Sequence, residues 1–280
     1  MSDYSTLRFE TQSLDTGGAV GRLVLDRPDR LNAFTPLMWQ ELRELGARLL
    51  ADPGDLRALV VIGEGRAFSS GIDTSVFTGE RGVDQVLADA APRHEDPIAA
   101  GILAAQDSYS WLEEAPFVTI AAVRGFALGA GLQLALACDI RIVARGTKLG
   151  LLEFKYGIMP DLGGTQRLPR LVGPGKAKEL IFTASRIDAE EAGRIGLAER
   201  VVADEELETI AGDLAREIAA APPLAVRGAK RAVNAAMSGA TVRDGLRVEA
   251  EGQAECLRSD DMKEAITAFV EDRTPVYGAR

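Results

Sequence analysis

The chain has 280 residues, 46% hydrophobic and 26% charged, enough for one large core with an appendage or for two modest domains. Its 42 acidic and 32 basic residues give a net charge of −10, which argues against a general nucleic-acid-binding protein. No apolar run reaches the ~18 residues of a membrane span, and residues 1–14 lack the basic start and apolar core of a secretory signal. We therefore expect a cytoplasmic protein with no nucleic-acid partner and no membrane insertion.

Cysteine and histidine are scarce. Cys138 and Cys256 lie far apart in the sequence, which is typical of reduced thiols in the cytosol. The one histidine, His94, lies in a polar segment, where we expect a surface residue. Serine–histidine triads, cysteine–histidine dyads and histidine-rich metal sites are therefore hard to build. Carboxylates must carry any acid–base chemistry.

The first 200 residues alternate between strand and helix patterns. Buried strands are predicted at residues 20–25, 58–62, 118–123 and 140–144. Helices are predicted at residues 36–50, with Pro36 in the first turn, and at residues 98–113. The apolar side of the first helix is expected to hold Leu37, Leu42, Leu45, Leu49 and Leu50. Such alternation favours a parallel sheet and an α/β core.

From Asp188 onward the patterns are helical. Helices are predicted at residues 189–195, 205–221, 224–237, 242–257 and 261–273, with Pro222-Pro223 between two of them and Pro275 closing the last. A late helical block packs on its own core or on a partner subunit. We predict a core domain over residues 1–204 and a helical region over residues 205–280. The acidic segment at residues 74–95 is predicted to be a mobile segment over a site.

Two glycine-rich loops each follow a predicted strand. The first is GRAFSSGID at residues 65–73, and the second is GFALGAGLQLALACDI at residues 125–140, which enters an apolar helix. Glycines let the backbone approach a ligand closely, and a helix start leaves N–H groups without intrahelical partners. Either loop alone reads as an ordinary strand-to-helix connection. Together they are able to supply the two N–H donors of an oxyanion hole.

Further motifs follow in a characteristic order along the chain. They are DRP at 26–28, LNAF at 31–34, GGTQRLP at 163–169, AEEA at 189–192 and AFVEDR at 268–273. With these motifs and the two glycine-rich loops, the sequence resembles the crotonase superfamily of enoyl-CoA hydratases and isomerases over nearly its whole length.

This resemblance implies an α/β crotonase fold, a spiral of ββα repeats followed by C-terminal helices that build a homotrimer or a dimer of trimers. It implies an acyl-CoA thioester as the substrate, with no separate cofactor and no metal. The thioester oxygen would lie between the backbone N–H groups of Ile72 and Ala130. Family members usually have glycine where Ala130 stands, a small departure because the N–H group acts and the side chain does not.

The resemblance also identifies the acid–base positions. Hydratases of the superfamily hold and activate water with two glutamates, which correspond here to Gln133 and Glu153. A glutamine can hold water but cannot exchange a proton with it, so the usual two-glutamate hydration is not expected. Burial of Glu153 among leucines would raise its pKa toward the range of a proton shuttle.

A third position is Asp161, eight residues after Glu153. Hydratases commonly have a small residue here, whereas dienoyl-CoA isomerases have an aspartate with a glutamate eight residues earlier. One carboxylate then removes a proton and the other donates one. This chain lacks the further aspartate that those isomerases carry where Gln133 stands, and a Δ3,Δ2-enoyl isomerase needs Glu153 alone. Asp161 is equally explained as a helix N-cap or as a turn residue after Pro160.

For the CoA moiety, the family pattern indicates the turn at residues 31–33 and the backbone at residues 67–71. The residues implied in substrate binding are Arg27, Leu31, Ala33, Ala67, Ser69, Ser70, Gly71, Asp73, Phe126, Gly129, Gln133 and Pro160. Asp73 either contacts the pantetheine arm or is structural, and Arg27 either approaches a phosphate or packs within its Arg-Pro turn.

The sequence leaves three functions open. The first is an acyl-CoA enzyme that shifts double bonds with Glu153 and Asp161, and the second is a 2-enoyl-CoA hydratase. The third is a crotonase-fold protein that binds acyl-CoA with little turnover. Gln133 leaves this third function open, whereas Glu153 together with Asp161 argues against it.

Overall fold

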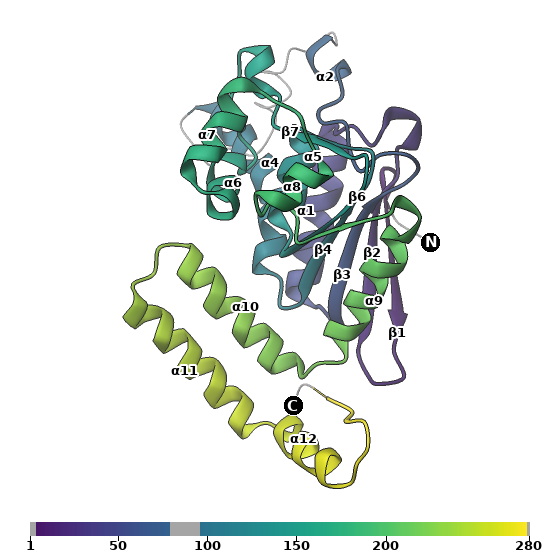
Figure 1. The fold of residues 1–280 in the computed structure, drawn as a ribbon, viewed down its shortest axis with the longest axis vertical. Helices are drawn as coiled ribbons and strands as arrows, with labels where there is room; N and C mark the ends of the chain where they lie inside the picture. The colour runs from purple at the N-terminus through teal and green to yellow at the C-terminus, as the bar shows by residue number, and fades with distance from the viewer. Residues whose placement is uncertain (1–3, 79–95, 279–280) are drawn as a thin grey trace.

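A computed structural model describes residues 4–78 and 96–278. Residues 79–95, which include His94 and most of the segment predicted to cover a site, lie outside the described residues. The body of the molecule is a mixed α/β structure, and a set of helices extends from it (Figure 1).

The main sheet has six strands in the order β1-β2-β3-β4-β6-β9. Its strands are β1 (Leu7–Ser13), β2 (Ala19–Leu25), β3 (Leu56–Gly63), β4 (Val118–Val123), β6 (Ile140–Ala144) and β9 (Arg200–Val202). β1 runs antiparallel to β2, and every other neighbour pair is parallel. The four predicted strands and their parallel pairing are confirmed. The edge strands β1 and β9 were not predicted because β1 is largely exposed without a continuous apolar run and β9 has only three residues.

A second, smaller sheet holds the second glycine-rich loop. It consists of β5 (Phe126–Leu128), β7 (Lys148–Gly150) and β8 (Ile187–Asp188). β5 leads directly into the apolar helix α5 (Ala130–Ala137), all of whose residues are buried. After β7 comes the short 3₁₀ helix η2 (Glu153–Tyr156). Two segments with candidate catalytic residues therefore leave this sheet side by side.

Helices cover both faces of the main sheet. On one face, α1 (Pro36–Ala51) and α4 (Pro97–Glu114) pack with α5 around the larger core cluster. The Thr35 side chain caps α1 by accepting a hydrogen bond from the Met38 N–H. The buried face of α1 is Met38, Leu42, Leu45 and Leu49, whereas Leu37 and Leu50 are exposed. The prediction was wrong at these two leucines because the helical period selects Met38 instead.

On the other face lies α9 (Leu207–Ala219), which presents Leu207, Ala211, Ala215 and Ala219 to the sheet at a spacing of four residues. This helix starts just after the predicted boundary at residue 204, yet it packs against the same sheet as the preceding residues. The remaining short elements are η1 (Pro28–Arg30), α2 (Ser75–Thr78), α6 (Gly164–Val172), α7 (Pro174–Thr183), α8 (Ala189–Arg194) and η3 (Asp204–Glu206).

Three helices form an arm that extends away from the body: α10 (Pro223–Met237), α11 (Val242–Arg258) and α12 (Asp260–Val270) (Figure 1). α10 and α11 approach closely at Gly228 and Gly252, where a Cβ on Gly228 would lie 3.5 Å from the Cα of Gly252. α12 ends at Val270, well before Pro275. The predicted end at residue 273 was wrong because Arg273 turns back to pair with Glu264.

The arm is anchored to the body by polar contacts. The ammonium group of Lys230 pairs with Asp139 at 2.8 Å and donates to the carbonyls of Leu112 and Phe117, each at 2.9 Å. The Asn234 amide donates to the carbonyl of Glu113 at 3.0 Å. These contacts fix α10 against the C-terminal end of α4.

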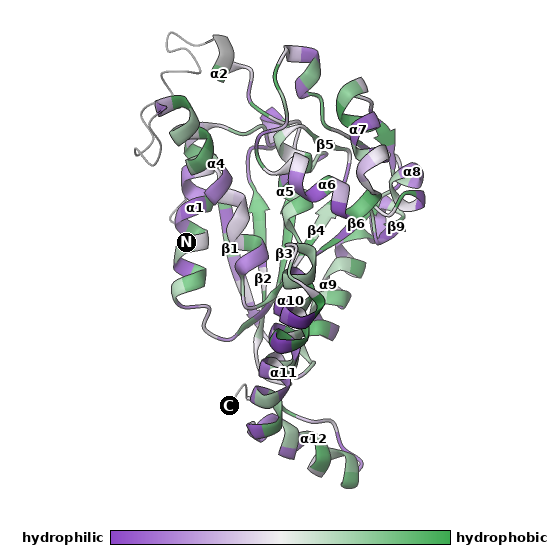
Figure 2. Ribbon diagram, turned by 90° about the vertical axis from the view of Figure 1, so that its left-hand side faces the viewer, coloured by the Kyte–Doolittle hydropathy of each residue, from purple (hydrophilic) through white to green (hydrophobic). Residues whose placement is uncertain are grey.

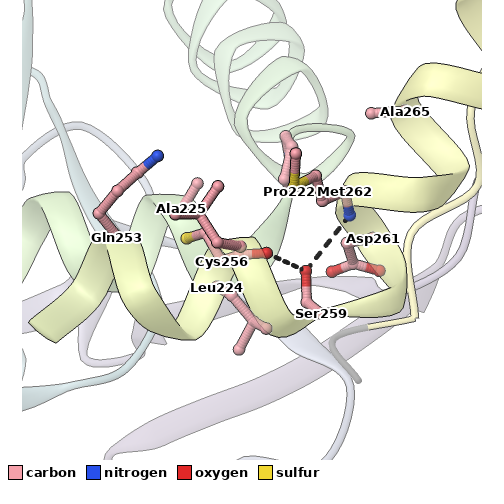
Figure 3. Close-up of a pocket in the computed structure, with 10 residues that line it drawn as sticks. Pro222, Leu224, Ala225, Gln253, Cys256, Ser259, Asp261, Met262 and Ala265 are labelled. Atoms are coloured by element: carbon pink, nitrogen blue, oxygen red, sulfur yellow. Dashed lines mark hydrogen bonds between the residues drawn. The ribbon is translucent and has the colours of Figure 1, made fainter.

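Between α10, α11 and α12 lies a pocket whose walls are mostly apolar (Figure 3). Ser259 closes one side of it as the N-cap of α12, accepting from the Met262 N–H and donating to the carbonyl of Cys256. Figure 2 shows hydrophobic residues along the helices of the arm, and several of them are exposed. Phe269 is 87% exposed and Val270 is 77% exposed.

Candidate active site

The two glycine-rich loops lie against each other and are joined by backbone hydrogen bonds. The Ser69 N–H donates to the carbonyl of Phe126 at 2.8 Å, and the Leu128 N–H donates to the carbonyl of Ser69 at 3.1 Å. The structure therefore brings together the two segments that the sequence singled out, although about 60 residues separate them along the chain.

Glycine is required where the loops touch. Gly71 has φ +104° and Gly129 has φ +50°, conformations that residues with side chains rarely adopt. A Cβ on Gly71 would lie 3.0 Å from the carbonyl oxygen of Leu128, and one on Gly129 would lie 4.0 Å from the Cα of Gly71. Two backbone segments pass at this distance only because neither carries a side chain.

Ile72 and Ala130 directly follow these two glycines. Within residues 4–78 and 96–278, neither the Ile72 N–H nor the Ala130 N–H donates to a protein acceptor. Ala130 is the first residue of α5, so its N–H has no intrahelical partner and lies at the positive end of the helix dipole. Ala130 is absent from the residues with positive φ, so alanine fits this position without strain. Two adjacent loops thus each present a free N–H donor, as an oxyanion hole requires.

Glu153 begins η2 and is buried beside these loops. A Cβ on Gly129 would lie 3.3 Å from its Oε1 atom, which places the carboxyl group next to the second loop. Oε1 accepts a hydrogen bond from the Gln133 amide at 2.8 Å. Oε2 is buried and has no partner among the described residues. Burial, reinforced by the charge of Asp161, raises the pKa of Glu153.

The Gln133 amide binds protein groups with both its oxygen and its nitrogen. Its Oε1 atom accepts from the N–H groups of Leu162 and Gly164, each at 2.8 Å, while its Nε2 donates to Glu153. The backbone donors thereby fix which end of the amide faces Glu153. A neutral donor, and not a second carboxylate, therefore holds the glutamate.

Asp161 lies in the loop between η2 and α6 and is half-buried. Burial raises its pKa, and its charge also acts to raise the pKa of Glu153, so the two carboxyl groups are near enough to interact. The N-cap of α6 is Gly163, with no side-chain cap. The alternative interpretation of Asp161 as a helix N-cap was therefore wrong.

Arg27 and Asp73 bind each other. Arg27 Nη2 lies 3.0 Å from Asp73 Oδ2, and Nη1 donates to the carbonyl of Ala33. Partial burial raises the pKa of Asp73, but hydrogen bonds from Ser75 and Arg27 outweigh this and lower it. Of the alternatives weighed for these residues, the packed arginine and the structural aspartate are the ones that the contacts describe.

The residues predicted to hold CoA lie on connected segments. Ser70 N–H donates to the carbonyl of Leu31 at 2.9 Å, and the Ser69 hydroxyl donates to the carbonyl of Asn32 at 2.8 Å. The buried Asn32 amide also donates to the carbonyl of Ala67 at 2.8 Å. The turn at residues 31–33 and the loop at residues 67–71 thus form one unit next to Gly71 and Ile72.

Phe126 and Pro160 lie on the other sides of the site. Phe126 is partly exposed at the start of β5 and accepts from Ser69. Pro160 is buried and lines an apolar groove between η2, α6 and α7, whose walls include Phe154, Met159 and Phe182. The rings of Phe154 and Phe182 are 5.7 Å apart.

Two residues of the site were missed by sequence reasoning. Gln106 donates to the carbonyl of Asp161 at 2.6 Å, and nothing in its sequence context signals this. Arg167 donates to the carbonyl of Leu162 at 3.0 Å; it lies within the GGTQRLP motif, which was used only for the family resemblance. Both residues hold the loop that carries Asp161.

Two further structural findings concern residues 4–78 and 96–278 alone. No three histidine, cysteine, aspartate or glutamate side chains gather there as a metal site would require. None of the helices in these ranges combines the length and apolar character needed to span a bilayer.

Comparison with known proteins assigns the chain to a family. The family model for enoyl-CoA hydratase/isomerase matches residues 15–280. The chain belongs to the enoyl-CoA hydratase/isomerase family. It is 37% identical to a short-chain-enoyl-CoA hydratase from Clostridium acetobutylicum over 93% of this chain and 94% of that protein. It is 36% identical to a crotonyl-CoA hydratase from Syntrophomonas wolfei over 95% of this chain and 97% of that protein.

Solved structures agree with this assignment. An enoyl-CoA hydratase from Bacillus anthracis superposes with a TM-score of 0.86 at 33% identity, covering 99% of this chain and all of the other. A Thermobifida fusca protein assigned as an enoyl-CoA hydratase, crystallised with CoA, superposes with a TM-score of 0.78 at 41% identity, covering 90% and 93%. The predicted crotonase fold of this family member is confirmed.

Proposed function

We propose that this protein shifts double bonds in enoyl-CoA thioesters, with Glu153 as the proton carrier and Asp161 as a second acid. The observation that supports this proposal most is the state of Glu153. One carboxylate oxygen is held by the neutral Gln133 amide at 2.8 Å, and the other is buried without a partner among the described residues. Such an oxygen is free to take up a substrate proton, and its raised pKa suits that task.

In the simplest reaction, Glu153 Oε2 removes a proton from C2 of a 3-enoyl thioester. The C–H electron pair moves into the thioester group, giving an enolate oxygen that the N–H groups of Ile72 and Ala130 stabilise. The enolate then collapses, the C3–C4 double bond moves to C2–C3, and the proton returns to C4. No atom is gained or lost, so one carboxyl group suffices.

A conjugated diene needs a second carboxyl group because its proton acceptor is more distant. Removal of the C2 proton from a 3,5-dienoyl thioester and protonation at C6 give the 2,4-diene. Asp161 shares the environment of Glu153, and burial raises the pKa of both groups. Two carboxyl groups in such a site ionise one at a time, which leaves one as a base and the other as an acid.

Hydration of 2-enoyl thioesters is the second candidate, favoured by the names of the relatives. Both the Clostridium acetobutylicum and the Syntrophomonas wolfei proteins are named hydratases. Against it stands Gln133, whose amide cannot accept a proton from water. In Gln133→Glu, one carboxylate oxygen would still accept from Leu162 and Gly164 while the other faced Glu153, completing a carboxyl pair. We expect that variant to gain hydratase activity.

A single substrate panel tests the proposal. Purified protein is given 2-enoyl, 3-enoyl and 3,5-dienoyl thioesters of matched chain length, and products are followed by absorbance and mass spectrometry. We expect isomerised products from the 3-enoyl and dienoyl substrates with no gain in mass. A product heavier by one water from the 2-enoyl substrate, formed faster than either isomer, would identify a hydratase. Tight CoA-ester binding without any product would identify a binding protein.

We also propose that the substrate is an acyl-CoA and that the arm assembles subunits. The Thermobifida fusca relative was crystallised with CoA and with acetoacetyl-CoA, which supports the ligand class. Exposed apolar residues on α11 and α12, including Val242 and Phe269, support an interface. A homotrimer or a dimer of trimers, as the family resemblance implies, would cover them.

A further inference from the structure

The loop that carries Asp161 is held by side chains from three different helices. Gln106 of α4 donates to the carbonyl of Asp161 at 2.6 Å. Gln133 of α5 accepts from the N–H groups of Leu162 and Gly164. Arg167 of α6 donates to the carbonyl of Leu162 at 3.0 Å. The backbone around Asp161 is therefore bound at four points within four residues.

Arg167 is the charged member of this set. Only 9% of its side chain is exposed. Besides the carbonyl of Leu162, it binds Glu113 at 2.7 Å and the Ser110 hydroxyl at 3.3 Å, both on α4. Its guanidinium group lies against Gly163, where a Cβ would come within 2.0 Å of Nη1. The planar fork thus connects α4 with the loop across a position that only glycine can occupy.

Arg167 is more deeply buried than an ion pair with Glu113 alone requires. The Glu113 side chain is 37% exposed, so pairing with it alone would leave Arg167 free to stay in solvent, where such a pair contributes little to stability. Burying a guanidinium group is costly unless its hydrogen bonds are satisfied. Here Nη1 and Nη2 are bound while Nε has no partner among the described residues, and one of the bound nitrogens donates to the loop carbonyl next to Asp161.

The α4 end to which Arg167 binds is itself held in place. The carbonyl of Glu113 accepts from Asn234, and that of Leu112 accepts from Lys230, both on α10. Loop, α6, α4 and α10 therefore form one connected set of hydrogen bonds, so Arg167 binds a fixed support.

We propose that Arg167 is a positioning residue that holds the loop at residues 161–164 so that Asp161 and Glu153 face the same acyl chain, a role that rests on the proposed function. It touches neither substrate nor reacting atoms and acts through the carbonyl of Leu162. Loss of this contact loosens the loop at Asp161, while the Gln133 amide still donates to Glu153. Only the reaction that needs both carboxyl groups should then suffer strongly.

The test compares Arg167→Lys with Arg170→Lys. Lysine keeps the charge beside Glu113 but loses the fork that also reaches Leu162, whereas Arg170 is exposed on the same helix and serves as the control. For Arg167→Lys we expect kcat for 3,5-dienoyl isomerisation to fall about 10- to 100-fold. The kcat for 3-enoyl isomerisation should change less than about threefold, and KM for both should stay near wild type. Equal losses on both substrates would overturn the proposal.

Hydrogen exchange at the Leu162 and Gly164 amides gives a readout independent of activity. A loosened loop opens more often and transiently releases these N–H groups from Gln133, so their exchange should accelerate in Arg167→Lys and not in Arg170→Lys. If the wild type isomerises no diene, the proposed function fails, while faster exchange still supports the loop-holding role and unchanged exchange overturns it. Should Arg167→Lys fail to fold, Glu113→Gln replaces it, since it removes the charged partner that holds Arg167 against α4 and so weakens, without deleting, the Arg167 contact with Leu162. It should then show a smaller shift of the same kind, and no shift overturns the proposal.

Discussion

The body and the arm differ in how far their polar and apolar groups are paired or covered. In the body, Gln133 and the loop at residues 161–164 are bound by specific polar partners beside Glu153, and the larger core cluster packs against the same elements. On the arm, large apolar side chains such as Phe269 and Val270 stay exposed. Exposed apolar surface of this kind supports the proposed subunit interface. The candidate site in the body is held in place within one chain, whereas the arm leaves apolar surface that another subunit would cover.

A second contrast lies within the body itself. The backbone donors of Ile72 and Ala130 and the Oε2 atom of Glu153 are left without partners among the described residues, amid a dense hydrogen-bond network. An unpaired buried polar group costs free energy, and such groups concentrate where a ligand will bind. The following experiments test both contrasts.

The largest effect is expected from Glu153→Gln. The amide keeps the size of the side chain and can still accept from Gln133, but it cannot carry a proton. Turnover of every enoyl thioester should fall by at least ~10²-fold, with KM little changed. Steady-state kinetics on the 3-enoyl substrate measure this, with the exposed Glu249→Gln as the control. Turnover near that of the wild type would remove Glu153 from the mechanism.

A smaller and more selective effect is expected from Asp161→Asn. Since Glu153 alone can return the proton to C4, 3-enoyl isomerisation should change by less than about threefold. Dienoyl isomerisation should fall about 10- to 100-fold because its distant carbon loses the acid. The ratio of the two kcat values is the measurement. Strong hydration of 2-enoyl-CoA by the wild type, unchanged in Asp161→Asn, would show that the roles of these positions are reversed.

Much of this site was predictable because its signals are local. The strands at β3 and β4 are continuous apolar runs, and the glycines before Ile72 and Ala130 stand in loops of characteristic composition. The hydrogen bonds from Gln106 and Arg167 that hold the Asp161 loop were not predictable. Gln106 and Asp161 are 55 residues apart, and Arg167 and Glu113 are 54 apart. Single hydrogen bonds across such separations leave no periodic pattern in a sequence.

In the helical region, too, the helices themselves were predictable, whereas the packing partner of one of them was not. Its helices α10 and α11 follow from their patterns, with Pro223 starting the first. That α9 belongs to the sheet was not predictable from its amphipathic pattern, because a stripe of Ala211, Ala215 and Ala219 fits a helix partner and a sheet equally well. The choice depends on which surface lies within reach after η3.

The assembly prediction concerns the exposed end of α12. If Phe269 is buried between subunits, Phe269→Asp places a charge in an apolar interface and should dissociate the assembly. Sedimentation should then fall from a wild-type mass of about three or six times 29.8 kDa toward that of one chain. Thr267→Asp, at an exposed polar position of the same helix, serves as the control. A wild-type monomer at micromolar concentration would contradict the proposed interface.

The smallest expected effect is on stability as a function of pH. Because burial raises the pKa of Glu153 above its ordinary value of 4.5, the folded protein binds that proton more tightly than the unfolded chain does. Its contribution to stability is fully present below pH 4.5 and is lost as the pH rises through the raised pKa. Glu153→Gln lacks this titration. Its stability relative to the wild type should therefore increase from pH 4 to pH 8, by about 1.4 kcal/mol for each unit of pKa shift.

Denaturant unfolding at fixed protein concentration measures the difference, again with Glu249→Gln as the control. A difference that stays constant with pH would mean that Glu153 titrates alike in the folded and unfolded chains, and its unpaired Oε2 would then be as well solvated as an exposed carboxylate.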